Sequence, residues 1–160
     1  MKMQNNKKKK VVHRHSKERT AKKRGISILE GISKDHSSLS RAYQLTQRVS
    51  RVGFDWPTIG GILKKLEEEL KELRQALLLK SRRRIGEEIG DLLFVLVNIA
   101  RFLRIDPEEA LNKTLKKFIS RFSYIEKSLR RKGKTLHQSN LIEMDRLWEE
   151  AKRKKRGGSK

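Results

Sequence analysis

The stretch Glu87-Glu88-Ile89-Gly90-Asp91 runs directly into Leu92-Leu93-Phe94-Val95-Leu96-Val97-Asn98-Ile99-Ala100 and decides the fold. Positions three, four and seven apart share one face of a helix, so the polar residues form a stripe along an otherwise apolar rod. The stripe consists of Glu87, Glu88, Asp91 and Asn98. Such a rod must be buried, and buried carboxylates without partners are costly. The stripe must therefore meet cations, either Lys and Arg or a metal ion, and we favour a metal ion.

The composition predicts one domain with a small core. The chain has 160 residues, of which 35% are hydrophobic and 38% are charged, so we expect a core smaller than the length implies, with tails attached. Cysteine is absent, which excludes disulfides and cysteine-ligated zinc and fits a reducing, cytoplasmic location. No secretory signal and no apolar stretch of about 18 residues is present. We therefore expect a soluble protein without a membrane partner.

The net charge of +22 is concentrated at the two ends of the chain. Residues 1–35 carry a net charge of +9 and residues 151–160 carry +6, which together make two thirds of the total. The first of these stretches lacks helix or strand periodicity over most of its length, so we expect a disordered leader. It is either an arm that binds nucleic acid or another polyanion, or simply a solvated extension.

Apolar residues recur at helical spacing throughout the rest of the chain. We predict an all-α, antiparallel bundle of about five helices, at 37–52, 58–80, 83–103, 107–131 and 140–155. Ser37 or Ser38, Asp106 and Asn140 are candidate N-caps, and Gly53 and Gly133 end helices. Strand alternation, a glycine-rich phosphate loop and zinc-type spacing are all absent.

Two acidic pairs lie on consecutive predicted helices. Glu69 and Glu72 form an E-x-x-E pair, and Glu88 and Asp91 form an E-x-x-D pair. The first pair alone would be typical of an exposed face that pairs with neighbouring lysines. However, the 15 residues between Glu72 and Glu88 are enough to end one helix, turn at 80–82 and return antiparallel. Four converging carboxylates would repel one another unless compensated, and their oxygen atoms suit a hard cation such as magnesium.

Three further polar residues are candidates for contacts with a ligand. Lys117 and Arg121 lie one turn apart on the fourth predicted helix, and their spacing fits a phosphate clamp and a solvated basic face equally well. Asn98 lies two turns beyond Asp91, where it is better placed to orient or contact a ligand than to bind a metal ion.

Several linked motifs follow one another along about 38–152. They are Val52-Gly53-Phe54-Asp55-Trp56-Pro57, Lys65-Leu66-Glu67-Glu68-Glu69-Leu70-Lys71-Glu72-Leu73, Glu87-Glu88-Ile89-Gly90-Asp91-Leu92-Leu93-Phe94, Val97-Asn98-Ile99-Ala100-Arg101, Lys117-Phe118, Arg121-Phe122 and Leu147-Trp148-Glu149-Glu150-Ala151-Lys152. In this order and spacing the motifs resemble the MazG-type nucleoside triphosphate pyrophosphohydrolases, and in longer members of that family the match is to the second domain.

The resemblance implies an enzyme that splits a nucleoside triphosphate into the monophosphate and pyrophosphate, for clearance of the nucleotide pool. It implies Mg²⁺ as cofactor, with Mn²⁺ able to substitute. The implied catalytic metal ligands are Glu69, Glu72, Glu88 and Asp91. The implied substrate-binding residues, together with Asn98, are Lys65, Glu68, Arg84, Glu87, Lys117, Arg121 and Trp148.

The same resemblance implies a homodimer or a dimer of dimers, so that a partner subunit completes the bundle and covers the second side of the apolar rod. The expected domains are a basic leader at 1–35, a catalytic domain at 36–150 and a basic tail at 151–160. The alternative is a basic helical protein associated with nucleic acid or the ribosome, built on a catalytically silent fold of this type. In that case the carboxylates would only pair with Lys and Arg.

Overall fold

The structure, a computed structural model, describes residues 27–157, with side chains as far as Lys154. Most of the predicted leader (residues 1–26) and the end of the predicted tail (residues 158–160) lie outside this part of the chain. Residues 27–157 contain five α-helices, one short 3-10 helix and no strand, which confirms the all-α prediction. None of the helices within 27–157 has the length and apolar character that crossing a bilayer requires.

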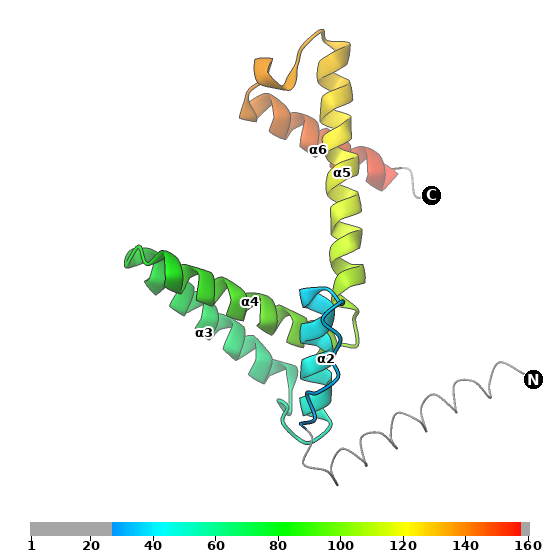
Figure 1. Cartoon of the computed structure of the whole chain (residues 1–160). Coiled ribbons are helices and arrows are strands. Elements are labelled where there is room, and N and C mark those ends of the chain that lie inside the picture. Colours follow the sequence, from blue (N-terminus) through cyan, green and yellow to red (C-terminus); the bar gives the residue numbers. More distant parts are fainter. Residues whose placement is uncertain (1–26, 158–160) are drawn as a thin grey trace, which may run out of the picture. The chain divides into compact units, whose positions relative to one another are not determined.

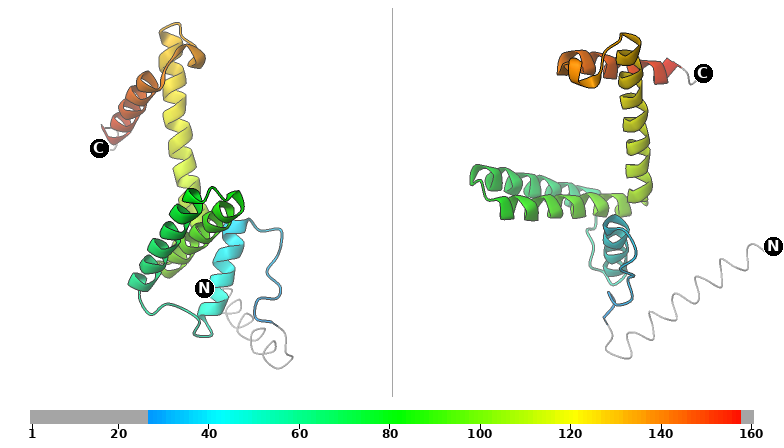
Figure 2. Two further views of the ribbon diagram at one scale, coloured as in Figure 1. Left: turned by 90° about the vertical axis from the view of Figure 1, so that its left-hand side faces the viewer. Right: turned by 45° about the horizontal axis from the view of Figure 1, so that its top comes forward.

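The chain divides into two compact units, Met1–Pro107 and Glu108–Lys160, which are described separately. The first unit contains α2 (Ser38–Ser50), α3 (Ile59–Leu78) and α4 (Arg82–Phe102). Helices α3 and α4 form an antiparallel hairpin, and α2 packs against α4 (Figures 1 and 2). The predicted antiparallel return between the two acidic pairs is thus present.

The turn of this hairpin is short because its residues satisfy the helix ends locally. Leu79 caps α3, and its backbone N–H donates to the Gln75 carbonyl. Lys80 then adopts a left-handed backbone conformation with φ of 50°, which ends the helix. The hydroxyl of Ser81 accepts a hydrogen bond from the backbone N–H of Arg84 and begins α4.

The core of the first unit lies along the contact between its helices. Ile62 and Ala76 of α3 and Val95 and Val97 of α4 are all buried. The connector between α2 and α3 packs on this core at Gly61, where an added Cβ atom would lie 2.7 Å from Cδ1 of Trp56. Glycine is therefore required at this position for the indole to approach the helix.

The predicted apolar rod is only half covered by its own chain. Val95, Val97 and Asn98 are buried, whereas Leu93 and Leu96 of the same helix are about half exposed, at 51% and 50%. Further exposed apolar residues of the same hairpin are Leu63, Leu70, Ile89 and Phe94. The apolar character on all sides of this helix thus exceeds what one chain buries.

The second unit contains α5 (Pro107–Arg131), the 3-10 helix η1 (Leu136–Gln138) and α6 (Leu141–Gly157). Ile125 and Leu129 of α5 and Leu147 of α6 form its core. Phe122, Tyr124, Leu136, Met144 and Trp148 pack around them. Gly133, with φ of 69°, reverses the chain after α5 as predicted.

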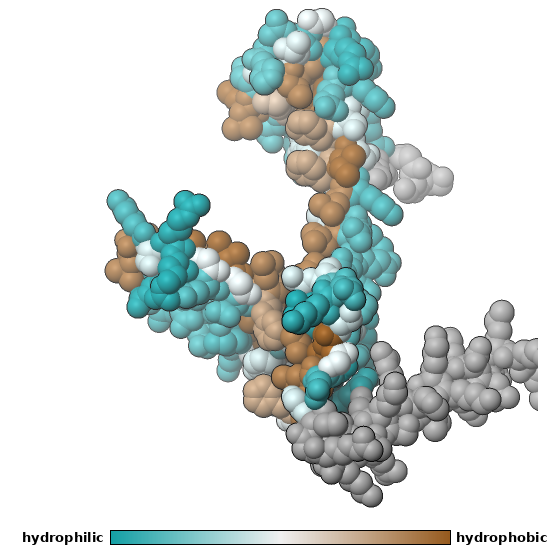
Figure 3. Space-filling view, viewed as in Figure 1, coloured by the Kyte–Doolittle hydropathy of each residue, from teal (hydrophilic) through white to brown (hydrophobic). Residues whose placement is uncertain are grey.

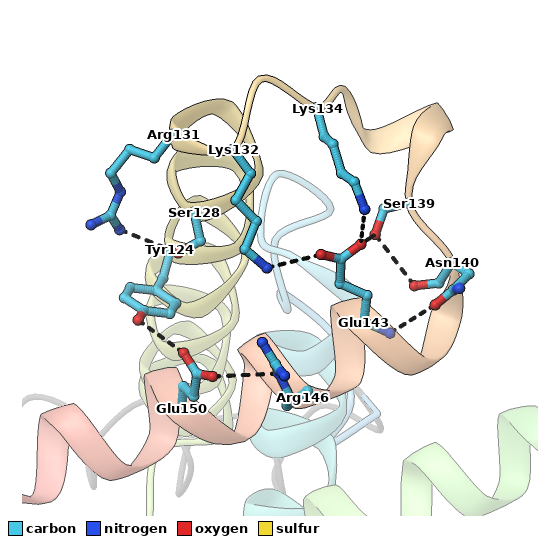
Figure 4. Close-up of polar contacts among 10 residues, drawn as sticks. All are labelled: Tyr124, Ser128, Arg131, Lys132, Lys134, Ser139, Asn140, Glu143, Arg146 and Glu150. Atoms are coloured by element: carbon cyan, nitrogen blue, oxygen red, sulfur yellow. Dashed lines mark hydrogen bonds and ion pairs between the residues drawn. The ribbon is translucent and has the colours of Figure 1, made fainter.

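A carboxylate at the start of α6 joins the elements of this unit (Figure 4). Glu143 pairs with Lys132 at 2.9 Å and Lys134 at 3.0 Å, and it accepts a hydrogen bond from Ser139 at 3.1 Å. The side-chain oxygen of Asn140 accepts from the backbone N–H of Glu143 at 2.8 Å, which confirms the predicted cap. Hydrogen bonds from the two lysines lower the pKa of Glu143 from 4.5 to about 2.

This lowered pKa predicts an acid-sensitive contribution to stability. Because the folded protein holds Glu143 ionised more strongly than the unfolded chain does, the contribution is complete above the ordinary pKa of 4.5 and is lost as the pH falls toward about 2. The Tm of Glu143→Gln should therefore lie below that of the unmodified protein at neutral pH, and the gap should close on acidification. Glu126→Gln, an exposed change on α5, is the control, and a gap independent of pH would contradict the assignment.

Candidate functional site

The two acidic pairs converge between α3 and α4. Carboxylate oxygens of Glu69, Glu88 and Asp91 all lie within 4.8 Å of one another. On the α3 side, oxygens of Glu68, Glu69 and Glu72 also lie within 4.8 Å of one another. Glu69 belongs to both groups and is 4% exposed, so it is the buried centre of the cluster. Glu88 is half-buried, and Asp91 and Glu72 are exposed.

Two of the predicted site residues, Glu68 and Glu69, form ion pairs with a lysine of their own helix. Lys65 binds Glu69 at 2.6 Å and Glu68 at 2.9 Å. These hydrogen bonds, the one to Glu69 first, raise the pKa of Lys65 above its ordinary value. Lys65 thus fixes the buried carboxylate of Glu69 from the side of α3, as an ordered support for the cluster.

The remaining carboxylates of the cluster lack such a partner. Among residues 27–157, no ion pair joins Lys or Arg to Glu72, Glu88 or Asp91. Partial burial, and after it the negative charges of Glu72 and Glu69, raise the pKa of Glu88. Charge therefore accumulates in the cluster without full compensation, which is the condition that favours binding of a divalent cation.

Glu87 and Arg84, which precede the second acidic pair, lie in the first turns of α4. Glu87 pairs with Arg83 at 2.6 Å, and both side chains are more than half exposed. The side chain of Arg84 is exposed, and its backbone N–H is capped by Ser81. Both residues therefore lie on the same helix as Glu88 and Asp91 with accessible side chains.

Asn98 is buried, at 4% exposure, and is held in place by Arg101. The side-chain oxygen of Asn98 accepts hydrogen bonds from Nε and Nη2 of Arg101 at 3.0 and 2.9 Å. Arg101 also forms a two-point ion pair with Asp55, at 2.7 and 2.6 Å. Hydrogen bonding to Arg101 lowers the pKa of Asp55.

Sequence reasoning missed this positioning network. Arg101 and Asp55 are 46 positions apart, and no periodicity links an arginine near the end of one helix to an aspartate in a connector. The available signal was the placement of Arg101 three residues after Asn98, on the same helical face, together with the single carboxylate, Asp55, in the connector before Pro57.

The other predicted residues lie in the second unit. Arg121 lies over the ring of Trp148, with its guanidinium carbon 5.3 Å from the ring centroid, and Phe118 contacts the same indole at a centroid distance of 5.4 Å. The Nε of Arg121 is buried without a hydrogen-bond partner. Lys117, one turn earlier, is exposed. The structure therefore pairs Arg121 with Trp148 and leaves Lys117 free to meet an anion.

The fold and this cluster define a class of protein. An all-α chain whose helical hairpin gathers carboxylates from an E-x-x-E and an E-x-x-D pair offers an oxygen-only ligand set of the kind that hard divalent cations prefer. Residues 58–125 match the family model described as the MazG nucleotide pyrophosphohydrolase domain. Residues 58–125 therefore form a MazG-type domain.

Three curated relatives agree with the match. The chain is 44% identical over 115 residues, 72% of its own length and 44% of the relative's, to the nucleoside triphosphate pyrophosphohydrolase/pyrophosphatase MazG of Thermotoga maritima. It is 36% identical over 140 residues, 85% of its length, to the nucleoside triphosphate pyrophosphohydrolase of Escherichia coli K12, of which it covers 52%. It is also similar to YabN of Bacillus subtilis, with 54% identity over 69 residues, 43% of this chain and 14% of YabN. The chain thus spans about half the length of the first two relatives, and the resemblance seen in its motifs is confirmed.

Proposed function

We propose that this protein is a magnesium-dependent nucleoside triphosphate pyrophosphohydrolase that converts a nucleoside triphosphate and water into the monophosphate and pyrophosphate. The observation that carries the proposal is the convergence of Glu69, Glu88 and Asp91 within 4.8 Å, with two of the three lacking a cationic partner in the described part of the chain. The names of the relatives from Thermotoga maritima and Escherichia coli support the same reaction.

The ligand set proposed for the metal ion is Glu69, Glu72, Glu88 and Asp91. These side chains fit a hard cation because every donor is a carboxylate oxygen and the cluster carries uncompensated negative charge. When bound, Mg²⁺ or its substitute Mn²⁺ supplies charge neutralisation for the triphosphate and a more acidic water for attack on phosphorus. Lys65 orients the carboxylate of Glu69, and we assign activation of the water to the site as a whole.

The residues proposed to contact the nucleotide are given for each unit by itself. In the first, Lys65, Glu68, Arg84, Glu87 and Asn98 lie on the two helices that carry the carboxylates. Arg101 acts as a positioning residue, since it holds the buried amide of Asn98. In the second, Lys117 and Arg121 are proposed to stabilise the negative charge on the leaving pyrophosphate. Stacking on Trp148 would restrict the guanidinium of Arg121 before the substrate binds.

The catalytic domain is proposed to comprise residues 36–150, flanked by the basic leader and tail, and to act as a homodimer or a dimer of dimers in the cytoplasm. Half-exposed Leu93 and Leu96 on the rod support the dimer, because an apolar face of this kind is stabilised by a second copy.

The proposed dimer predicts the mass of the protein in solution. Sedimentation equilibrium should give at least twice the mass of one chain.

The proposed reaction is tested directly with the purified chain of 160 residues. The assay uses a panel of standard and modified nucleoside triphosphates. We expect Mg²⁺-dependent hydrolysis of at least one of them, with release of pyrophosphate and monophosphate in equal amounts, as clearance of the nucleotide pool requires. Added EDTA should abolish the release. If every triphosphate is left intact, the enzymatic proposal fails, and the alternative of a nucleic-acid- or ribosome-associated protein on a silent fold gains support. That alternative draws on the basic termini, which carry two thirds of the net charge.

A further inference from the structure

The end of the α3–α4 hairpin carries three exposed leucines in succession. Leu77, Leu78 and Leu79 are 53%, 83% and 64% exposed. They end α3 and open the turn that leads into α4, so they lie at the tip of the hairpin rather than along the face that contains the acidic cluster. In Figure 3 the free end of the hairpin shows apolar surface beside strongly hydrophilic surface.

The same tip is strongly cationic. Lys80, Arg82 and Arg83 follow the leucines and are all exposed. Between Glu72 and Glu87 the chain contains no Asp or Glu. Only Arg83 forms an ion pair, with Glu87 at the base of the tip, and no described carboxylate pairs with Lys80 or Arg82. We call residues 77–83 the hairpin tip.

These two properties together restrict what can cover the hairpin tip. A nucleic acid would satisfy the cations but would leave the leucines in water. A second copy of the tip would bury leucines but would bring like charges together. A lipid surface with anionic headgroups offers negative charge above an apolar layer. The lysine and arginines of the tip could contact the headgroups while the leucines enter the apolar layer.

We propose that the hairpin tip binds anionic lipid surfaces, with Leu78 and Leu79 inserted at the boundary between headgroups and acyl chains. The expectation of no membrane partner rested on the lack of a segment that could span a bilayer. Peripheral binding at the membrane surface does not require such a segment. The proposal does not depend on hydrolysis of nucleotides.

The test uses the full chain and vesicles of phosphatidylcholine with or without phosphatidylglycerol. Leu78→Ser/Leu79→Ser should lower partitioning to the anionic vesicles at least about tenfold, because the apolar insertion is lost. The matched control is Leu141→Ser/Ile142→Ser. These residues are at least as exposed on average, at 78% and 82% against 83% and 64% for Leu78 and Leu79. Acidic Glu143 and Asp145 follow them, and the change should alter partitioning less than about twofold.

Measurements at high salt separate insertion from simple attraction by the basic termini. In 1 M salt the Debye length is only about 3 Å, so attraction through the termini should disappear while the leucine-dependent part persists. Equal partitioning of the tip variant and the unmodified protein at low and high salt would overturn the proposal.

A fluorescent label gives a second readout, because the chain has no native cysteine. An environment-sensitive dye on Leu79→Cys should shift to the blue with anionic vesicles, whereas the same dye on Leu141→Cys should not. A blue shift that appears without vesicles when the protein concentration is raised would show that a second copy of the chain covers the tip. That result would overturn the lipid proposal. An unchanged spectrum at Leu79→Cys with vesicles would also overturn it.

Discussion

Pyrophosphate release should fall by at least about a hundredfold in Glu69→Gln, since even residues that only support metal ligands contribute 10- to 100-fold. Glu69 is the one carboxylate shared by both groups of the acidic cluster, and it is the most buried of them. The amide keeps the volume of the side chain and an acceptor for Lys65 but removes the charge that a cation requires. The loss should therefore appear in catalysis and Mg²⁺ binding rather than in folding.

The matched control for this change is Glu67→Gln. Glu67 lies two positions away on α3, is exposed, and is absent from both acidic groups. Its substitution removes the same charge from the same helix and should leave the rate within about twofold. Calorimetric titration with Mg²⁺ should show weakened binding only for Glu69→Gln. Retention of full activity by Glu69→Gln would exclude the cluster as the metal site.

Arg101→Ala should give the largest loss of stability, about 2–3 kcal/mol in the free energy of unfolding. The substitution removes the Arg101 donors from the buried Asn98 and leaves Asp55 with the backbone N–H of Trp56. Breaking a buried ion pair costs roughly 3–5 kcal/mol. We expect the lower figure because the Asp55 side chain is 25% exposed and remains partly solvated. Urea denaturation at a fixed protein concentration measures the difference.

Two further variants identify the cause of that loss. Arg101→Lys should recover only part of the stability, because one ammonium group cannot reproduce the two-point contact with Asp55 and also reach Asn98. Arg83→Ala breaks an exposed ion pair with Glu87 and should cost less than about 0.5 kcal/mol. Similar losses in Arg83→Ala and Arg101→Ala would show that the buried network has no special role.

The secondary structure was readable from the sequence because its signals are local. Predicted helices at 58–80 and 83–103 became Ile59–Leu78 and Arg82–Phe102. The helix predicted at 107–131 has the expected bounds, Pro107–Arg131. Caps such as Ser37 and Asn140 are present where polar side chains precede apolar repeats. Capping, helical periodicity and glycine at chain reversals depend on residues a few positions apart, so they need no knowledge of the tertiary structure.

The candidate site was only partly readable for the same reason. The spacing of Glu88 and Asp91 placed two carboxylates on one helical face, and the intervening length predicted that the chain would return to Glu69. The sequence could not decide which carboxylates would be taken up by nearby cations. In the structure Lys65 binds Glu68 and Glu69. Which carboxylates pair with Lys65 depends on side-chain conformation. The spacing within the E-x-x-E and E-x-x-D pairs does not predict it.

Spacing along the chain was sufficient to predict the helices, their order and the two acidic pairs, because each depends on residues within one segment. Only the tertiary structure decided that Glu69 would be the buried centre of the cluster, and that Asp55 and Arg101 would meet across 46 positions. It also decided which residues of the apolar rod are buried, such as Val95 and Val97, and which are half exposed, such as Leu93 and Leu96. The physical reason is that burial and long-range pairing depend on which faces the folded chain brings together, and local spacing does not contain that information.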